Sequence, residues 1–167
     1  MERADDLFES YGGVIRIARF GPVFAGIYGS PLSAEAFDEV LHWQRPLMPA
    51  EPILQFSLAF SAHRLQPDVQ AAADRLLTEY GPRTCGSATV LTASGFQASA
   101  ARAMLATIYL LTRVSYPRRV FADVGEAEAW LTSLGKYSRS IAASALWLTE
   151  AVAAQAAQSS ASATPPR

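Results

Sequence analysis

Three residues whose side chains can together cleave an ester or amide bond lie close together in the middle of the chain. Ser61, His63 and Asp68 fall within eight residues. A catalytic triad needs a hydroxyl bonded to a base that a carboxylate orients. Ser61 and His63 share one face if the preceding strand continues, but Asp68 follows Pro67 and suits the first turn of a helix. We therefore expect a polar loop and a helix start, and assign no catalytic residue.

The other reactive side chains also form no recognisable site. His42 and His63 are the only histidines, they lie far apart in the sequence, and neither belongs to an H-E-x-x-H motif, so the case for a metal site is weak. Cys85 is the single cysteine, which excludes an internal disulfide and a multi-thiolate metal site, and we interpret it as a small buried hydrophobic side chain. Phosphate-binding and dinucleotide-binding glycine patterns are absent from the sequence. We expect neither a metal nor a cofactor.

Two stretches could bind a partner. Arginines at 113, 118 and 119 flank Tyr116-Pro117. This stretch is either a binding site for an anion or an acidic partner, or a solvent-exposed connecting segment. In the nearly uncharged, Ala-rich segment 137–158, apolar residues recur at helical spacing and form a narrow seam. This seam can pack on the chain's own sheet or on a second copy. The candidate partner-binding residues are Ile141, Trp147, Leu148, Val152, Tyr116, Arg118 and Arg119.

Composition limits the classes of function. The chain has 167 residues, half of them hydrophobic, and a formal net charge of -1. A single domain with its own core is expected at this length, and nucleic-acid binding is not expected without a basic excess. The longest apolar run, 103–112, is about half of what a membrane span needs. The charged start lacks the apolar run of a signal peptide, which favours the cytoplasm.

The elements that must position these residues alternate along the chain. Apolar and β-branched runs predict strands at 13–20, 23–28, 53–60, 87–92 and 118–122. Caps, prolines and 3.6-residue spacing predict helices after Ser33, from Pro67, over 96–112, after Asp123 and over 137–158. Two of these elements carry polar residues beside their apolar face. Gln44 falls in line with Phe37 and Val40, while Gln55 and Ser57 share one face of a strand.

The order of elements predicts an α/β fold. We expect a small mixed sheet of about five strands, which opens with an antiparallel hairpin around Gly21-Pro22 and continues with β-α-β units. Helices pack on the sheet, and an extra Ala-rich helix follows it. The expected division is an N-terminal extension at 1–12, the α/β domain at 13–135, the C-terminal helix at 136–158 and a disordered tail at 159–167.

This pattern resembles the STAS domain, the fold of bacterial anti-sigma-factor antagonists, and the related SpoIIAA-like proteins. The best local likeness is the stretch 119–131, RVFADVGEAEAWL, which is similar to the family's last strand and helix. The resemblance implies a domain that binds other proteins. The family's phosphorylated Asp-Ser-x-Gly motif is not present, because the matching loop reads SAHRLQPD at 61–68. The phosphorylation switch is therefore not carried over.

Two functions remain open. The first is a non-enzymatic bacterial interaction domain, regulatory or assembly-forming, that binds another protein or a second copy of itself, with no nucleic acid and no membrane insertion. The alternative is a small-molecule or lipid-binding module with a pocket between sheet and helices, lined by Phe56, Phe60, Phe96 and Tyr109. A hydrolase at Ser61 and His63 is the remote third possibility.

Overall fold

A single mixed sheet forms the centre of the chain. The computed structural model describes residues 3–60, 66–92, 99, 102 and 114–162. The strands are β1 (Asp6–Glu9), β2 (Ile15–Phe20), β3 (Val23–Tyr28), β4 (Ile53–Ala59), β5 (Thr84–Leu91) and β6 (Arg118–Phe121), and they lie side by side in chain order. The first three are antiparallel, and β3 to β6 are parallel. The expected α/β fold with a mixed sheet is confirmed, with six strands in place of about five.

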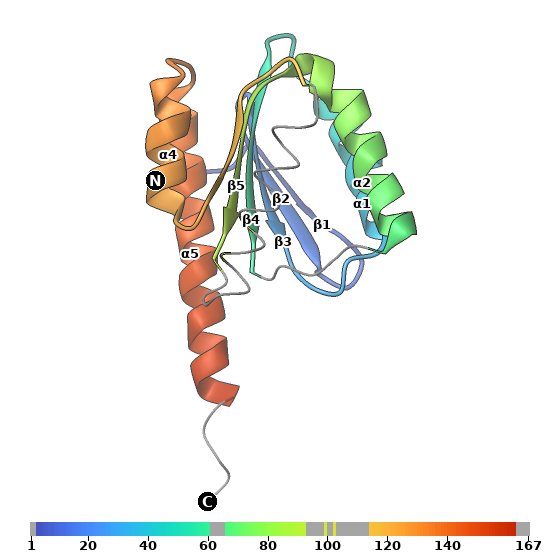
Figure 1. The fold of residues 1–167 in the computed structure, drawn as a ribbon, viewed down its shortest axis with the longest axis vertical. Coiled ribbons are helices and arrows are strands. Elements are labelled where there is room, and N and C mark those ends of the chain that lie inside the picture. Colours follow the sequence, from blue (N-terminus) through green and yellow to red (C-terminus); the bar gives the residue numbers. More distant parts are fainter. Residues whose placement is uncertain (1–2, 61–65, 93–98, 100–101, 103–113, 163–167) are drawn as a thin grey trace, which may run out of the picture.

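Helices cover both faces of the sheet (Figure 1). On one face lie α1 (Ala34–Gln44) and α2 (Pro67–Tyr80), which are followed by the short 3-10 turns η1 (Arg45–Leu47) and η2 (Gly81–Arg83). On the other lie α4 (Val124–Ser133) and α5 (Ser138–Ser162). Because α1 and α2 join neighbouring parallel strands in the same direction along the sheet, right-handed crossovers place both on one face. The helix expected over 96–112 falls almost entirely outside the described residues.

Two apolar layers result from the alternation of side chains along the strands. Between the sheet and α4 and α5, the buried side chains include Phe56, Leu58, Leu131, Ile141 and Leu148. Between the sheet and α1 and α2, fewer large strand residues are buried, among them Ile15, Ile17 and Phe24. The helices contribute Phe37, Val40, Val69 and Leu76 to this layer. The second layer leaves space above β4 and β5, and this space holds the candidate site.

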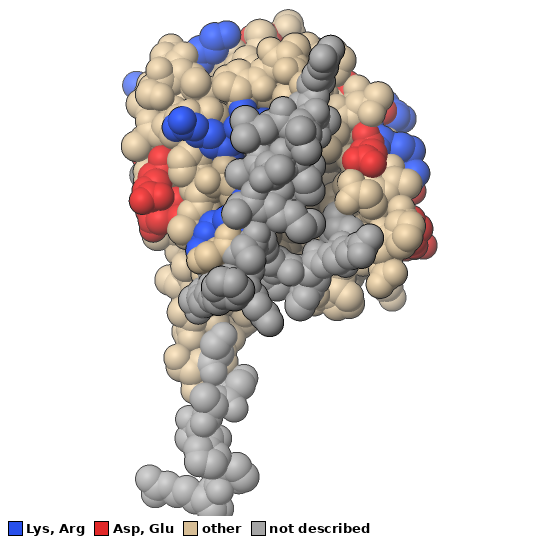
Figure 2. Space-filling view, viewed as in Figure 1, with Lys and Arg blue, Asp and Glu red and all other residues tan. Residues whose placement is uncertain are grey.

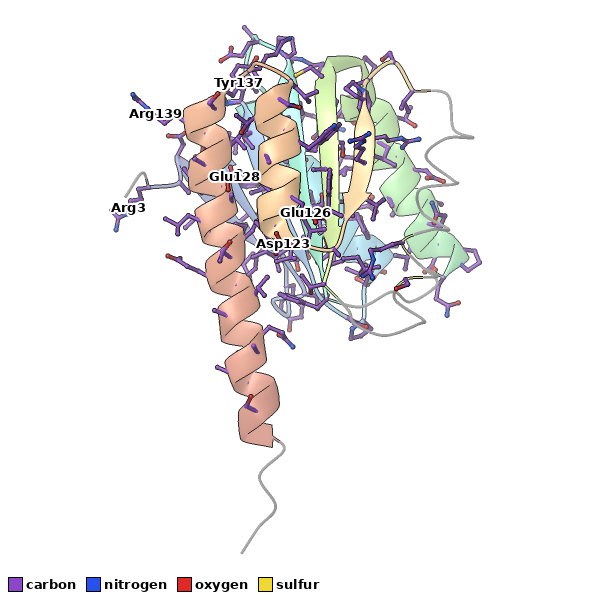
Figure 3. The ribbon with its side chains drawn as sticks, turned by 60° about the vertical axis from the view of Figure 1, so that its left-hand side comes forward. Arg3, Asp123, Glu126, Glu128, Tyr137 and Arg139 are labelled. Carbon is purple, nitrogen blue, oxygen red and sulfur yellow. The ribbon has the colours of Figure 1, made fainter. Side chains whose placement is uncertain are left out.

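Local signals fix the ends of several elements. Gly21 has a φ of 56° in the two-residue turn between β2 and β3, a conformation that glycine adopts without strain. The Ser33 hydroxyl accepts a hydrogen bond from the Ala36 amide at 3.2 Å and caps α1. The Asp123 carboxylate caps α4, where it accepts from the amides of Gly125 and Glu126 (Figure 3). These caps are those that the sequence predicts.

The N-terminal residues expected to form an irregular extension belong to the sheet. Asp6–Glu9 forms β1 and pairs with β2. The Arg19 guanidinium holds this strand, because its Nη2 lies 2.6 Å from the Asp6 carboxylate, and the backbone amide of Asp5 donates to the Arg19 carbonyl. The pairing depends on the contact between Arg19 and Asp6, which are thirteen residues apart. The short acidic segment alone therefore does not predict a strand.

The C-terminal helix is longer than expected. It runs through Ser162, four residues past the expected boundary at 158. Alanine has the highest helix propensity, and the first proline beyond the helix is Pro165, so nothing in 159–162 stops it. The first half of α5 packs on β2, β3 and α4. The second half extends past the edge of the sheet (Figure 1).

Candidate functional site

A cavity with a polar floor lies between the sheet and the helices α1 and α2. Its volume is about 140 Å³. The described residues that line it are Ile17, Phe24, Gly26, Tyr28, Phe37, Gln44, Gln55, Ser57, Ala73, Leu76, Leu77, Ser87 and Thr89. None of these residues carries a charge. The cavity therefore combines apolar helix residues above with hydroxyl and carboxamide groups below.

The floor is built by two parallel strands in register. Gln55 of β4 lies beside Ser87 of β5, and Ser57 lies beside Thr89. Neighbouring strands are about 4.8 Å apart, and side chains two positions apart along a strand share a face. The four side chains thus form a compact polar array on the face toward α1 and α2. No hydrogen bond ties the side chains of Gln55, Ser57 or Ser87 to another described residue.

Gln44 closes the array from the helix side. It lies at the last position of α1, seven residues after Phe37, and therefore on the buried side of the helix. Only 6% of the residue is exposed, and its Oε1 has no hydrogen-bond partner among the described residues. A buried polar atom without a partner costs about 1–3 kcal/mol of folding free energy. The cavity wall is therefore the place where a hydrogen-bond donor would satisfy this atom.

Aromatic side chains form one wall of the cavity. The ring of Tyr28 stacks on that of Phe37, with centroids 6.1 Å apart and planes 21° apart. Tyr28 lies over Gly26, where an added Cβ would come within 2.8 Å of the Tyr28 ring. Gly26 is the lateral neighbour of Ser57. A glycine at this point of β3 therefore makes room for the aromatic wall beside the polar floor.

An apolar groove lies on the opposite side of the molecule, between the start of the chain and α5. Its volume is about 150 Å³, and Arg3, Ala4, Leu7, Phe20, Ala143, Leu146, Trp147 and Glu150 line it. Leu7 is 66% exposed and Leu146 is 46% exposed. Trp147 packs on Phe20, with ring centroids 6.5 Å apart. Figure 3 shows Arg3 on the outer side of α5.

The predicted partner-binding residues of the seam do not share one environment. Ile141 and Leu148 are fully buried against the sheet and α4. Trp147 and Val152 are half-buried at the edge of the same core. Of the two arrangements left open for this helix, the structure shows packing on the chain's own sheet. A partner can reach Trp147 and Val152, but not Ile141 and Leu148, without opening the core.

The predicted cationic stretch also separates in space. Arg113 lies outside the described residues, and Tyr116 is buried. Arg118 and Arg119 are consecutive residues of β6, so their side chains point to opposite faces of the sheet. The Arg119 guanidinium lies 5.9 Å from the centroid of the Trp130 ring, a cation–π contact. The two arginines do not converge on a single anion.

Of the four aromatic residues expected to line a ligand pocket, the two that the structure describes lie in the other apolar layer. Phe56 is fully buried under α4 and α5, and Phe60 packs against that same core. The cavity lies on the other face of β4, because side chains alternate along a strand. Phe96 and Tyr109 lie outside the described residues, as do Ser61 and His63 of the triad hypothesis. The sequence pattern places Gln55 and Ser57 on one face of a strand. It assigns Ser87 and Thr89 to a strand without predicting that they line a site.

Other reactive groups occupy structural positions. Cys85 is a free thiol, half-buried against the α4 and α5 layer. His42 is exposed on α1. Among the described residues no group of three or more potential metal ligands comes together, and no described helix has the length and apolar character to cross a membrane. Comparison with protein-family models, with curated proteins and with solved structures finds no match.

Proposed function

We propose that this chain is a non-enzymatic protein-interaction domain that associates through α5, with a second copy of the chain as its partner. The observation that carries this proposal is the second half of α5. Residues 153–158 are exposed, and 151–162 contain no charged residue. Because the segment has no charged residues, no side-chain ion pair can stabilise it, and an exposed helix of this kind gains stability mainly from packing. A second helix packed along its exposed alanines would supply such packing.

The apolar groove extends this surface toward the body of the domain. Leu146, Glu150, Ala153 and Ala157 follow one another at helical spacing, and all four are exposed. They form a strip that leads from the groove to the free end of α5. In Figure 2 the visible part of α5 below the body shows neither basic nor acidic residues. The two alanines at the far end of the strip allow two helices to approach closely there.

Charges at the rim of the groove are compatible with a two-fold arrangement. Arg3 and Glu150 both line the groove and carry opposite charges. In a symmetric dimer the same patch faces itself, so Arg3 of one copy can lie beside Glu150 of the other. This supports a second copy over an unrelated partner as the occupant.

The biological setting stays a prediction from the sequence. The STAS-like pattern favours a regulatory or assembly role in the bacterial cytoplasm. An interaction domain of this kind acts by presenting a surface, and a dimer formed through α5 would leave the remaining surfaces of both copies open to a further partner. The proposal needs no residue of the chain to perform chemistry.

The test is the mass of the chain in solution. We expect light scattering after size exclusion to give twice the 18.0 kDa of one chain at micromolar concentrations. Ala153→Asp introduces a charge into the strip at an exposed position, so the protein should fold and return to the mass of one chain. Leu146→Asp should act in the same way, because its side chain is also exposed.

A matched control separates the interface from general effects of charge. Ala71 is exposed on α2, on the opposite face of the sheet. Ala71→Asp makes the same change in a helix and should leave the dimer intact. If the wild-type protein keeps the mass of one chain at concentrations up to about 100 μM, the result contradicts self-association. The binding free energy of the dimer would then be weaker than roughly 5 kcal/mol.

A further inference from the structure

We propose that the cavity between the sheet and α1 and α2 is a binding site for a small uncharged molecule, with a flat apolar body and one amide or hydroxyl edge. This goes beyond the proposed interaction through α5, because none of the cavity residues belongs to α5 or the groove. The two proposals can therefore succeed or fail separately.

The polar floor is the first argument for a ligand. β4 and β5 are inner strands of the sheet, and the face toward the helices of an inner strand is normally apolar. Here the two strands place Gln55, Ser57, Ser87 and Thr89 together. The opposite face of the same strands is apolar, with Leu54, Phe56 and Leu58 in the core. The polarity is thus confined to the side that carries the cavity.

Gln44 gives a second and independent argument. Its side chain comes from α1, is more than nine-tenths buried, lines the cavity and has an Oε1 without a partner among the described residues. A buried polar group normally has a partner. A carboxamide can present either its oxygen or its NH₂ group to the same position by rotating about its last bond. A ligand that carries both a donor and an acceptor would satisfy it.

The lining residues define the chemistry of the ligand. None of the described residues that line the cavity is charged, and an ion buried without a partner is strongly disfavoured. The stacked rings of Tyr28 and Phe37 provide a flat apolar surface. The volume of about 140 Å³ is close to that of an engineered cavity of about 150 Å³ that binds benzene. The ligand is therefore the size of a single ring with a polar substituent.

Three probes of nearly equal shape test this assignment on the full-length protein. Benzamide has the apolar ring and the amide edge, benzoate replaces the amide by a charge, and toluene lacks the polar edge. Titration followed by NMR should show saturable binding of benzamide, with a Kd on the order of 1 mM for a ligand of about nine heavy atoms. Benzoate and toluene should each bind about tenfold more weakly.

Substitution of Gln44 provides the test at residue level. Gln44→Leu keeps the approximate volume and removes the carboxamide, so benzamide binding should weaken by about tenfold while toluene binding does not weaken. The unliganded variant should melt at the wild-type temperature or higher, because the unpartnered atom is gone. Gln70→Leu is the matched control: Gln70 is exposed on α2 and does not line the cavity. It should leave benzamide binding unchanged.

Three results would overturn the proposal. The first is that no probe saturates, which would mean a hydrated space. The second is that benzoate binds as well as benzamide, which would mean an anion site. The third is that Gln44→Leu binds benzamide as the wild type does. If Gln44→Leu fails to fold, Ser57→Ala replaces it, because this change removes one floor hydroxyl from a half-buried position, and unchanged benzamide binding in this variant then contradicts the site.

Discussion

Tyr80, the last residue of α2, joins the two helices of one layer through a single hydroxyl. Its hydroxyl donates a hydrogen bond to the Leu41 carbonyl of α1 at 2.9 Å. Burial raises the pKa of this phenol to about 12, and the nearby Glu79 carboxylate adds to the effect. The neutral phenol is therefore the form that the folded chain requires.

The raised pKa predicts a loss of stability in alkaline solution. Above pH 10 the unfolded chain releases the Tyr80 proton while the folded chain keeps it, so the free energy of unfolding falls between about pH 10 and pH 12, by roughly 2 kcal/mol. Tyr80→Phe should cost about 1 kcal/mol at pH 8 through the lost hydrogen bond. It should also show a smaller fall above pH 10 in urea denaturation.

Tyr11 provides the control for this prediction. It is 94% exposed, so Tyr11→Phe should leave both the stability at pH 8 and the alkaline loss as in the wild type. An alkaline loss of equal size in the Tyr80→Phe variant would show that another group causes it.

Single residues differ in how far their role can be predicted from sequence. Ser33 and Asp123 were predicted as caps because a cap depends on atoms two or three residues away. Gln44 was assigned to the apolar face of its helix, but its unpartnered Oε1 depends on which strands lie beneath that face. The cavity could therefore be predicted only in part, through Gln44, Gln55 and Ser57.

At the scale of elements, α4 approaches β5 closely because Gly86 has no side chain. A Cβ at Gly86 would lie 2.6 Å from Leu134 Cδ1 and 2.8 Å from Leu54 Cδ2. Both contacts are far below van der Waals distance, and both leucine side chains sit against the packed layer between sheet and helices. An added Cβ would therefore displace the ends of both leucine side chains from their packed positions.

The close approach predicts a large effect of a single methyl group. Gly86→Ala should lower the free energy of unfolding by about 1–3 kcal/mol, because core residues must shift to accept the added atom. Gly81→Ala is the matched control, since a Cβ there would meet only Tyr116 at 3.8 Å. It should change stability by about 0.5 kcal/mol or less. Equal effects in urea denaturation would contradict the packing argument.

Elements with a strong local pattern were predicted well. The hairpin of β2 and β3 and the helix α2 carry their turn, proline and spacing signals within a few residues. β1 has only four residues, and its place at the edge of the sheet depends on the distant Arg19. The end of α5 was predicted too early because a run of alanine and serine was interpreted as a tail.

At the scale of the whole molecule, the helical layer of α4 and α5 comes from residues that follow the last strand of the sheet. Ile141 and Leu148 of α5 are fully buried on β2 and β3. Each side chain of this kind contributes roughly 1.5–3 kcal/mol through burial. A chain without α5 would expose these strands, whereas residues 153–158, beyond Val152, are exposed and bury no side chain of this kind.

Two truncations test this division of α5. A chain that ends at residue 152 should keep its free energy of unfolding within about 1 kcal/mol of the wild type and lose self-association. A chain that ends at residue 135 should fail to fold cooperatively, because several kcal/mol of a typical 5–15 kcal/mol are removed. Circular dichroism during thermal denaturation distinguishes the two. Cooperative unfolding of the shorter chain would contradict the role of α5 in the core.

The contact between α5 and the first strands has a consequence for synthesis. Strands lie in chain order, so each new strand can pair with the one before it as the chain emerges. Among the described residues, the helix that covers the apolar side of β2 and β3 comes much later: these strands are packed by residues 138–151, more than a hundred positions further along the chain. Until residues 138–151 have been synthesised, the nascent chain presents that face to its surroundings, and this is the interval in which chaperone binding or aggregation would compete with folding.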